Sequence, residues 1–252
     1  MKILKDIFYS NETNKNKALD VYLPDGECKA VFLYIHGGGI EHGDKAHHYR
    51  EGEYLAKNGY AFISINYRMY PNAKYPDFIC DSAEAVAWAK KNIRELCGCD
   101  KLYVGGSSAG GYISMMLCFD KRYLEAVGLS NKDIAGYWHD AGQPTFHFNV
   151  LKYEGYDPRR VIVDEHAPLY FVGLEKEYPP MRFIVSDNDM FARYEQTMLM
   201  LKTMEHFGYK HYDHFVASGK HCEYFNDSKL LEDGTTLASH MIEDFLDNAD
   251  SI

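Results

Sequence analysis

The sequence predicts an α/β fold: an open, mostly parallel twisted sheet with helices on both faces. Short runs rich in β-branched and aromatic residues alternate with segments of helical spacing, and the inner runs are almost continuously apolar. The chain has 252 residues, 46% of them hydrophobic, which is enough for a sizeable core, so we expect a single domain over 1–252. The expected strands are 18–23, 30–35, 61–66, 101–104, 182–185 and 212–216.

Apolar residues that recur at steps of three, four and seven predict the helices between these strands. The first stripe follows Pro76, a residue that suits a first helical turn. The three stripes are Ile79, Ala83, Val86 and Ile93; Tyr194, Met198, Leu201 and Met204; and Leu237, Met241 and Phe245. In parallel sheets of this kind, functional residues gather on loops at the carboxyl ends of the strands.

The segment 131–180 has no clear periodicity and has "GYWHDAGQPTFHFN" near its start. A stretch of this kind inside a compact domain is typical of a lid or binding insertion, so we expect a small cap there. Tyr137 and Trp138 are candidate lining residues of that cap, with core packing as an equally weighted alternative.

The composition indicates a small-molecule partner. A formal net charge of −10 argues against general binding of nucleic acid or anionic membranes, which depends on clustered Lys and Arg. The six cysteines are expected to be mostly free thiols, and the spacing of Cys97 and Cys99 matches neither a redox motif nor a zinc motif. The apolar stretch at the start is too short for a secretory signal and no run reaches membrane-spanning length, so we expect a cytoplasmic protein; whether it forms a homo-oligomer stays open.

The stretch "YVGGSSAGGY" predicts a strand, a tight turn and a helix with a serine at the apex. Gly106 and Gly110 flank Ser108 in the pattern Gly-x-Ser-x-Gly, and small neighbours of this kind let a strained serine project from the sheet edge. Ser107 fits the pattern less well. A glycine-rich phosphate loop is the alternative, but the lysine of a P-loop is absent.

A second glycine motif, "HGGG", directly follows the apolar run 31–35. The bare backbone N–H groups of Gly37 and Gly38, together with that of Ala109, are candidates for an oxyanion hole. A flexible turn is the alternative.

The motifs "HGGG", "NYRMYPNAKYPDFICD", "AVAWAKKNI" and "GGSSAGG" occur in the order and spacing of the α/β-hydrolase fold esterases. Over roughly residues 20–221 the chain resembles the hormone-sensitive-lipase-like carboxylesterases and the related small acetyl esterases. The resemblance implies that Tyr67, Arg68, Pro76 and Asp81 are structural supports. The residue after the glycines, usually aromatic in these relatives, is Ile40, a candidate substrate-binding position.

A catalytic serine in this fold needs an acid and then a histidine later in the chain. "SDNDMF" offers Asp187 and Asp189 at the end of a strand, and the resemblance selects Asp189 because an apolar pair follows it. Since Ser186 replaces a glycine usual in the family, Asp187 stays open. His221 follows a glycine-containing turn after the last strand, where the family has its histidine.

The chain is therefore expected to be a serine esterase for short-acyl esters, with acetylated or feruloylated carbohydrate as a candidate substrate. The acyl-enzyme mechanism requires no cofactor and no metal. Two alternatives stay open: an amidase of the arylformamidase type, and a ligand receptor that has the fold without catalysis. A metal site made by His42, His47, His48 and Asp44 matches no familiar ligand spacing, so a solvated loop is favoured there.

Overall fold

A computed structural model describes residues 1–252 and contains one eight-stranded sheet in the order β1-β2-β4-β3-β5-β6-β7-β8. β1 and β2, and β2 and β4, pair antiparallel, whereas all the other neighbours are parallel. The predicted α/β class is therefore confirmed. The strands are β1 (Lys2–Phe8), β2 (Ala18–Leu23), β3 (Ala30–Ile35), β4 (Tyr60–Ile65), β5 (Leu102–Ser107), β6 (Gly136–Asp140), β7 (Met181–Asn188) and β8 (Tyr212–Lys220).

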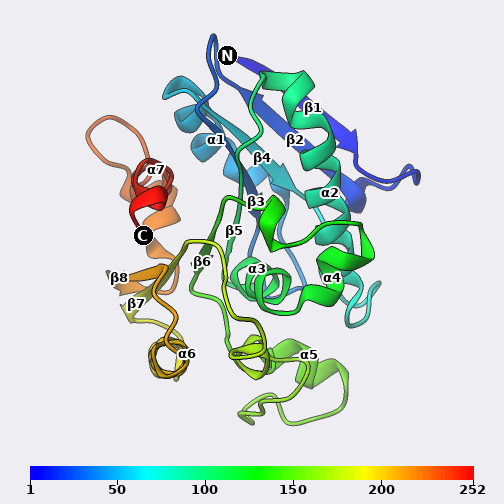
Figure 1. Cartoon of the computed structure of the whole chain (residues 1–252), viewed down its shortest axis with the longest axis vertical. Helices are drawn as coiled ribbons and strands as arrows, with labels where there is room; N and C mark the ends of the chain where they lie inside the picture. The colour runs from blue at the N-terminus through cyan, green and yellow to red at the C-terminus, as the bar shows by residue number, and fades with distance from the viewer.

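Helices cover both faces of the sheet, and Figure 1 shows α1 and α7 on one side with α2, α3 and α4 on the other. The helices are α1 (Tyr49–Lys57), α2 (Asp77–Cys97), α3 (Ala109–Phe119), α4 (Lys121–Ala126), α5 (Phe148–Tyr153), α6 (Arg193–His206) and α7 (Leu237–Asn248). None of them is both long and apolar enough to cross a membrane.

The central strands are buried on both faces, which explains their continuous apolar sequence. Along β3, Val31 and Leu33 pack in the larger core with α2 and α3, while Phe32 and Tyr34 pack in the smaller core with α1 and α7. Successive side chains of a strand point to opposite faces, so both layers depend on this strand.

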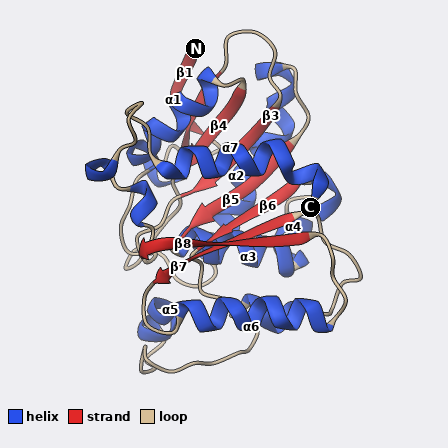
Figure 2. Ribbon diagram, turned by 90° about the vertical axis from the view of Figure 1, so that its left-hand side faces the viewer, coloured by secondary structure: helices blue, strands red, loops and turns tan.

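Strands β3, β5, β6, β7 and β8 run parallel, so their carboxyl ends meet at one edge of the sheet, as Figure 2 shows. The glycine-rich loop after β3, the serine turn after β5 and the turns after β6, β7 and β8 all lie along this edge. The fold therefore brings together the distant loops that the motifs single out.

The sequence prediction missed two strands, β1 and β6, and it placed the start of the irregular segment too early. Residues 136–140 are not part of a cap, because they form β6 between β5 and β7. Only residues 141–180, which include α5, lie outside the sheet between β6 and β7. All six cysteines are free thiols, as predicted.

Candidate active site

Ser108 occupies a strained turn between β5 and α3. Its backbone angles, φ 57° and ψ −115°, lie outside the regions that non-glycine residues commonly adopt. A Cβ on Gly106 would lie 2.5 Å from the Ile35 carbonyl oxygen, and one on Gly110 would lie 1.9 Å from the same atom. The two glycines of the Gly-x-Ser-x-Gly pattern are therefore required because β3 passes close to the turn. Ser107 is buried as the last residue of β5, while Ser108 is partly exposed.

The structure brings Ser108, His221 and Asp189 into one hydrogen-bonded chain. His221 Nε2 lies 2.8 Å from Ser108 Oγ, and His221 Nδ1 lies 2.5 Å from Asp189 Oδ1. Because an ionised carboxylate only accepts hydrogen bonds, Nδ1 carries a hydrogen and donates a hydrogen bond to Asp189. Nε2 is then free to accept the proton of the serine hydroxyl.

Asp189, rather than Asp187, is the acid that contacts the histidine. The Asp189 carboxylate is fully buried and also accepts hydrogen bonds from the backbone N–H groups of Ser186, at 3.1 Å, and Met190, at 2.7 Å. Burial raises the pKa of Asp189, but the hydrogen bond and charge of His221 and these two N–H groups outweigh it, so the pKa is lowered overall. Asp187 is exposed and accepts from the Gly219 N–H.

The glycine loop after β3 lies directly against the serine. A Cβ on Gly37 would lie 3.1 Å from Ser108 Cβ, and the N–H groups of Gly37 and Gly38 donate to no protein acceptor. Ala109 is the first residue of α3, where an N–H has no intrahelical partner. Free N–H groups close to a serine Oγ are what an oxyanion hole needs.

Buried polar contacts hold this loop in place. The His36 Nδ1–H donates to the Gly37 carbonyl at 2.7 Å, and burial lowers the pKa of His36 to about 4, so this ring is neutral. Tyr67 OH donates to the His36 carbonyl at 2.9 Å. Arg68 forms a bidentate pair with Asp81 at 2.8 and 2.7 Å, which ties the end of β4 to α2.

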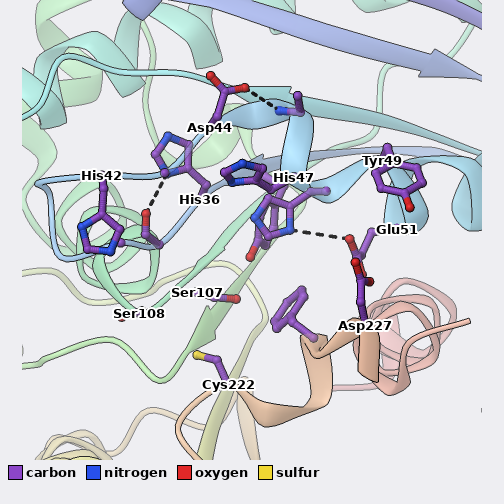
Figure 3. A pocket seen from close by; sticks show the side chains of 17 residues that line it. His36, His42, Asp44, His47, Tyr49, Glu51, Ser107, Ser108, Cys222 and Asp227 are labelled. Carbon is purple, nitrogen blue, oxygen red and sulfur yellow. Dashed lines mark hydrogen bonds and ion pairs between the residues drawn. The ribbon is translucent and has the colours of Figure 1, made fainter. Parts of the chain in front are cut away.

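A cavity of about 670 Å³ opens beside Ser108, with His47, Tyr49, Glu51 and Asp227 on its far side (Figure 3). No sequence pattern indicates these four residues as a set, because the start of α1 with the turn before it and the segment after β8 meet only in the fold. His42, His48 and Asp44 also line this cavity. No group of three or more His, Cys, Asp or Glu side chains in the chain has the geometry to hold a metal ion.

The prediction of three substrate-binding residues is wrong. Ile40, Tyr137 and Trp138 are completely buried in the core, and none of them lines this cavity. Tyr137 and Trp138 belong to β6, so their side chains pack on opposite faces of the sheet. Ile40 points into the larger core instead of toward Ser108.

Asp140, the last residue of β6, is a second buried carboxylate at this edge. Its backbone carbonyl accepts from the Ser108 N–H at 2.8 Å, its Oδ1 accepts from Tyr224 OH, and Cys222 Sγ lies 3.9 Å from Oδ2. Burial raises the pKa of Asp140 to about 7, and the negative charge of Asp189 adds to this rise. Hydrogen bonds from hydroxyl and thiol groups lower the pKa but only partly offset the effect of burial.

Comparison with solved structures gives the same fold over the whole chain. A truncated carbohydrate esterase from gut microbiota matches with a TM-score of 0.82 and 20% identity, covering 100% of this chain and 97% of that one. Esterase B from Lactobacillus rhamnosis matches with a TM-score of 0.80 and 20% identity, covering 99% of this chain and 85% of that one. The fold is therefore that of α/β-hydrolase esterases, as the motifs predicted.

Sequence relatives are similar over a shorter stretch. Esterase LipC of Mycobacterium tuberculosis is 36% identical over 89 residues, which cover 34% of this chain and 22% of LipC. The matched stretches span less than a third of the length of the curated relatives. The BD-FAE family model matches residues 19–151, more than half of the 252 residues, and includes the glycine loop and the serine turn. This chain therefore belongs to the BD-FAE family.

Proposed function

We propose that the chain is a carboxylic ester hydrolase that forms an acyl-enzyme on Ser108. The observation that carries this proposal is the continuous hydrogen-bonded chain from Ser108 through His221 to Asp189, with free backbone N–H groups and an open cavity beside the serine. Each part has the position that acyl transfer requires.

In the first half-reaction, His221 Nε2 takes the hydroxyl proton of Ser108 while Oγ attacks the ester carbonyl carbon. The carbonyl oxygen becomes negative and is stabilised by the N–H groups of Gly37, Gly38 and Ala109; one such donor typically contributes about 3 to 4 kcal/mol. Asp189 stabilises the imidazolium and fixes its tautomer. Collapse breaks the ester bond, and the leaving alcohol takes the proton from Nε2.

In the second half-reaction, His221 removes a proton from water, and the resulting oxygen attacks the acyl-serine. Release of Ser108 Oγ, which regains its proton from His221, gives the free acid. Every proton moves through His221, so the steps use no cofactor and no metal.

We propose that the alcohol part of the substrate is polar. The cavity beside Ser108 is lined by His47, Tyr49 and Asp227, which can hydrogen-bond to hydroxyl groups, and by Glu51, whose carboxylate is held by Thr236. An acetylated or feruloylated carbohydrate fits this lining, and one structural neighbour is described as a carbohydrate esterase.

We propose that residues 141–180 form a small cap on the same single domain. Asn149 of α5 donates to the Gly39 carbonyl at 2.7 Å, and Lys152 pairs with Glu41 at 2.7 Å, so the segment is fastened to the glycine loop. A cytoplasmic location is also part of the proposal, since six free thiols suit a reducing compartment.

The test compares Ser108→Ala with Ser107→Ala on 4-nitrophenyl acetate. Ser108→Ala should lower kcat by at least about 10³-fold, since loss of a triad nucleophile costs up to about 10⁶-fold, whereas Ser107→Ala should keep kcat within about tenfold. Near wild-type turnover of Ser108→Ala would refute the proposal. A parallel comparison of phenyl acetate with N-formylkynurenine separates an esterase from an arylformamidase.

A further inference from the structure

A second cavity, of about 440 Å³, lies between the segment after β6 and the start of α6, away from the serine. Helices α5 and α6 lie at the same end of the molecule in Figures 1 and 2. Three arginines line the cavity, namely Arg159, Arg160 and Arg193, and no carboxylate does. In a chain with a net charge of −10, this is an unusual concentration of positive charge.

Arg193 forms the buried part of this lining and has no acidic partner. Its side chain is almost completely buried, Nη1 donates to the Ala141 carbonyl, and Nη2 lies 3.4 Å from Gln143 Oε1. Nε donates to no protein acceptor, although it is not sealed off from solvent. Arginine keeps its proton in proteins, and a buried charge that makes no ion pair is costly; the charge of Asp189 acts on Arg193 without direct contact. A negative group in the cavity would supply the missing partner.

Arg160 supplies a second cation that makes no ion pair. It is exposed and forms no ion pair, and its guanidinium lies 6.0 Å from the centre of the Tyr156 ring. The adjacent Arg159 forms a bidentate pair with Asp157, so its charge is already balanced. Arg160 and Arg193 are therefore the two cations available to a ligand.

The remaining wall is apolar and exposed. Phe191 is fully exposed, Val161 is 62% exposed and Met190 is 41% exposed, and all three line the cavity together with Phe148. Large apolar side chains that remain in water beside a cavity mark a surface that binds something. The lining therefore has an apolar surface for the body of a ligand and a cationic surface for an anionic group.

We propose that this cavity binds an organic anion with an aromatic or aliphatic body, whose negative group is held by Arg160 and Arg193 and whose body packs on Phe191 and Val161. The ligand is either the distal part of the ester substrate or a separate organic acid. In both cases it contacts the turn of the catalytic acid, because Met190 N–H donates to Asp189 Oδ1 at 2.7 Å.

The binding test uses the Ser108→Ala protein, so that it does not depend on ester hydrolysis. Fluorescence titration with 1-anilinonaphthalene-8-sulfonate is compared with its uncharged analogue N-phenyl-1-naphthylamine. Arg160→Gln should weaken binding of the sulfonate about tenfold, which corresponds to about 1.4 kcal/mol, and change binding of the neutral probe less than twofold. Phe191→Ala should weaken both probes.

Arg94→Gln is the matched control, because it removes one exposed arginine whose partner is Asp100, outside the cavity lining. Its affinity for the sulfonate should stay within twofold of the Ser108→Ala parent. Equal loss in Arg94→Gln and Arg160→Gln, or no preference for the sulfonate over the neutral probe, would overturn the proposal.

The two sources of the anion are distinguished by inhibition of the wild-type enzyme acting on 4-nitrophenyl acetate in the presence of the sulfonate. A rise in KM at constant kcat assigns the cavity to the distal part of the substrate. A change in kcat assigns it to a separate organic acid that acts through the Asp189 turn. No effect on either constant, together with no Arg160-dependent binding, would refute the site.

Discussion

Asp189 and Asp140 are two buried carboxylates at the ends of neighbouring strands, and their environments drive their pKa values in opposite directions. Asp189 accepts from His221 and from two backbone N–H groups, and its pKa is lowered. Asp140 accepts from a tyrosine hydroxyl, lies beside a thiol, and has its pKa raised to about 7. Asp140 is the more deeply buried residue and has only neutral donors, whereas Asp189 faces the histidine, so burial and donors together decide which carboxylate keeps its charge.

This difference assigns different roles to the two residues. The charged Asp189 orients and stabilises His221, whereas Asp140 supports the serine turn through its backbone carbonyl and needs no charge to do so. Replacing each carboxylate by its uncharged isostere therefore tests the comparison.

Asp189→Asn should have the largest effect. An asparagine amide can present its N–H₂ group to Nδ1 and favour the wrong tautomer of His221, so kcat on 4-nitrophenyl acetate should fall about 10³- to 10⁴-fold. The fold should be retained because the asparagine oxygen can still accept from the Ser186 N–H, which bonds to the carboxylate oxygen that does not face His221. A kcat within tenfold of wild type, in a protein with an unchanged circular dichroism spectrum, would show that Asp189 is not the acid.

Asp140→Asn should change stability with little loss of activity. The pKa of Asp140 is about 7 in the folded state and about 3.9 in an unfolded chain. The folded state therefore binds the proton more tightly, and the free energy of unfolding of the wild type falls as the pH rises from about 4 to about 7. The variant should therefore gain unfolding free energy relative to wild type, on the order of 2 to 4 kcal/mol, between pH 4 and pH 8.

Urea denaturation at pH 4.5, 6 and 8 measures this difference. If the free-energy difference between Asp140→Asn and wild type did not change over this range, Asp140 would not be the group with the raised pKa. For Asp189 the sign is opposite: its lowered pKa stabilises the folded state above about pH 4, and this contribution is lost as the pH falls further.

Asp187→Asn should have the smallest effect of the three. Asp187 is exposed and makes one hydrogen bond, from the Gly219 N–H at 2.9 Å, which an asparagine oxygen can still accept. We expect kcat/KM within about threefold of wild type and an unfolding free energy within about 0.5 kcal/mol. A hundredfold loss of kcat/KM would reopen the choice between Asp187 and Asp189.

The sequence predicts the parts of this structure that depend on local pattern. Strands β2 and β3 are placed at their observed bounds, because both are short runs with β-branched and aromatic residues; β3 is also continuously apolar, as buried parallel strands typically are. Ser108, Asp189 and His221 are recognised because each follows a strand in the chain order of the fold.

The missed elements depend on distant partners. β6 reads as "GYWHD", and its His139 and Asp140 are buried only because Ser114 and Tyr224 supply hydrogen bonds from other elements. Tyr137 and Trp138 were predicted to line a cap because the sequence of an aromatic pair does not distinguish a core position from a pocket position. The sequence does not indicate that Arg193 is buried, because its burial depends on contact with the turn after β6.

Covalent labelling with a fluorophosphonate, followed by peptide mass spectrometry, tests the central claim most directly. One adduct is expected, on Ser108, at neutral pH, with labelling slowed by at least about 10²-fold in His221→Ala. An adduct on Ser107, or equal labelling rates with and without His221, would contradict it. Absence of any adduct on the folded wild-type protein would point to a receptor instead of an enzyme.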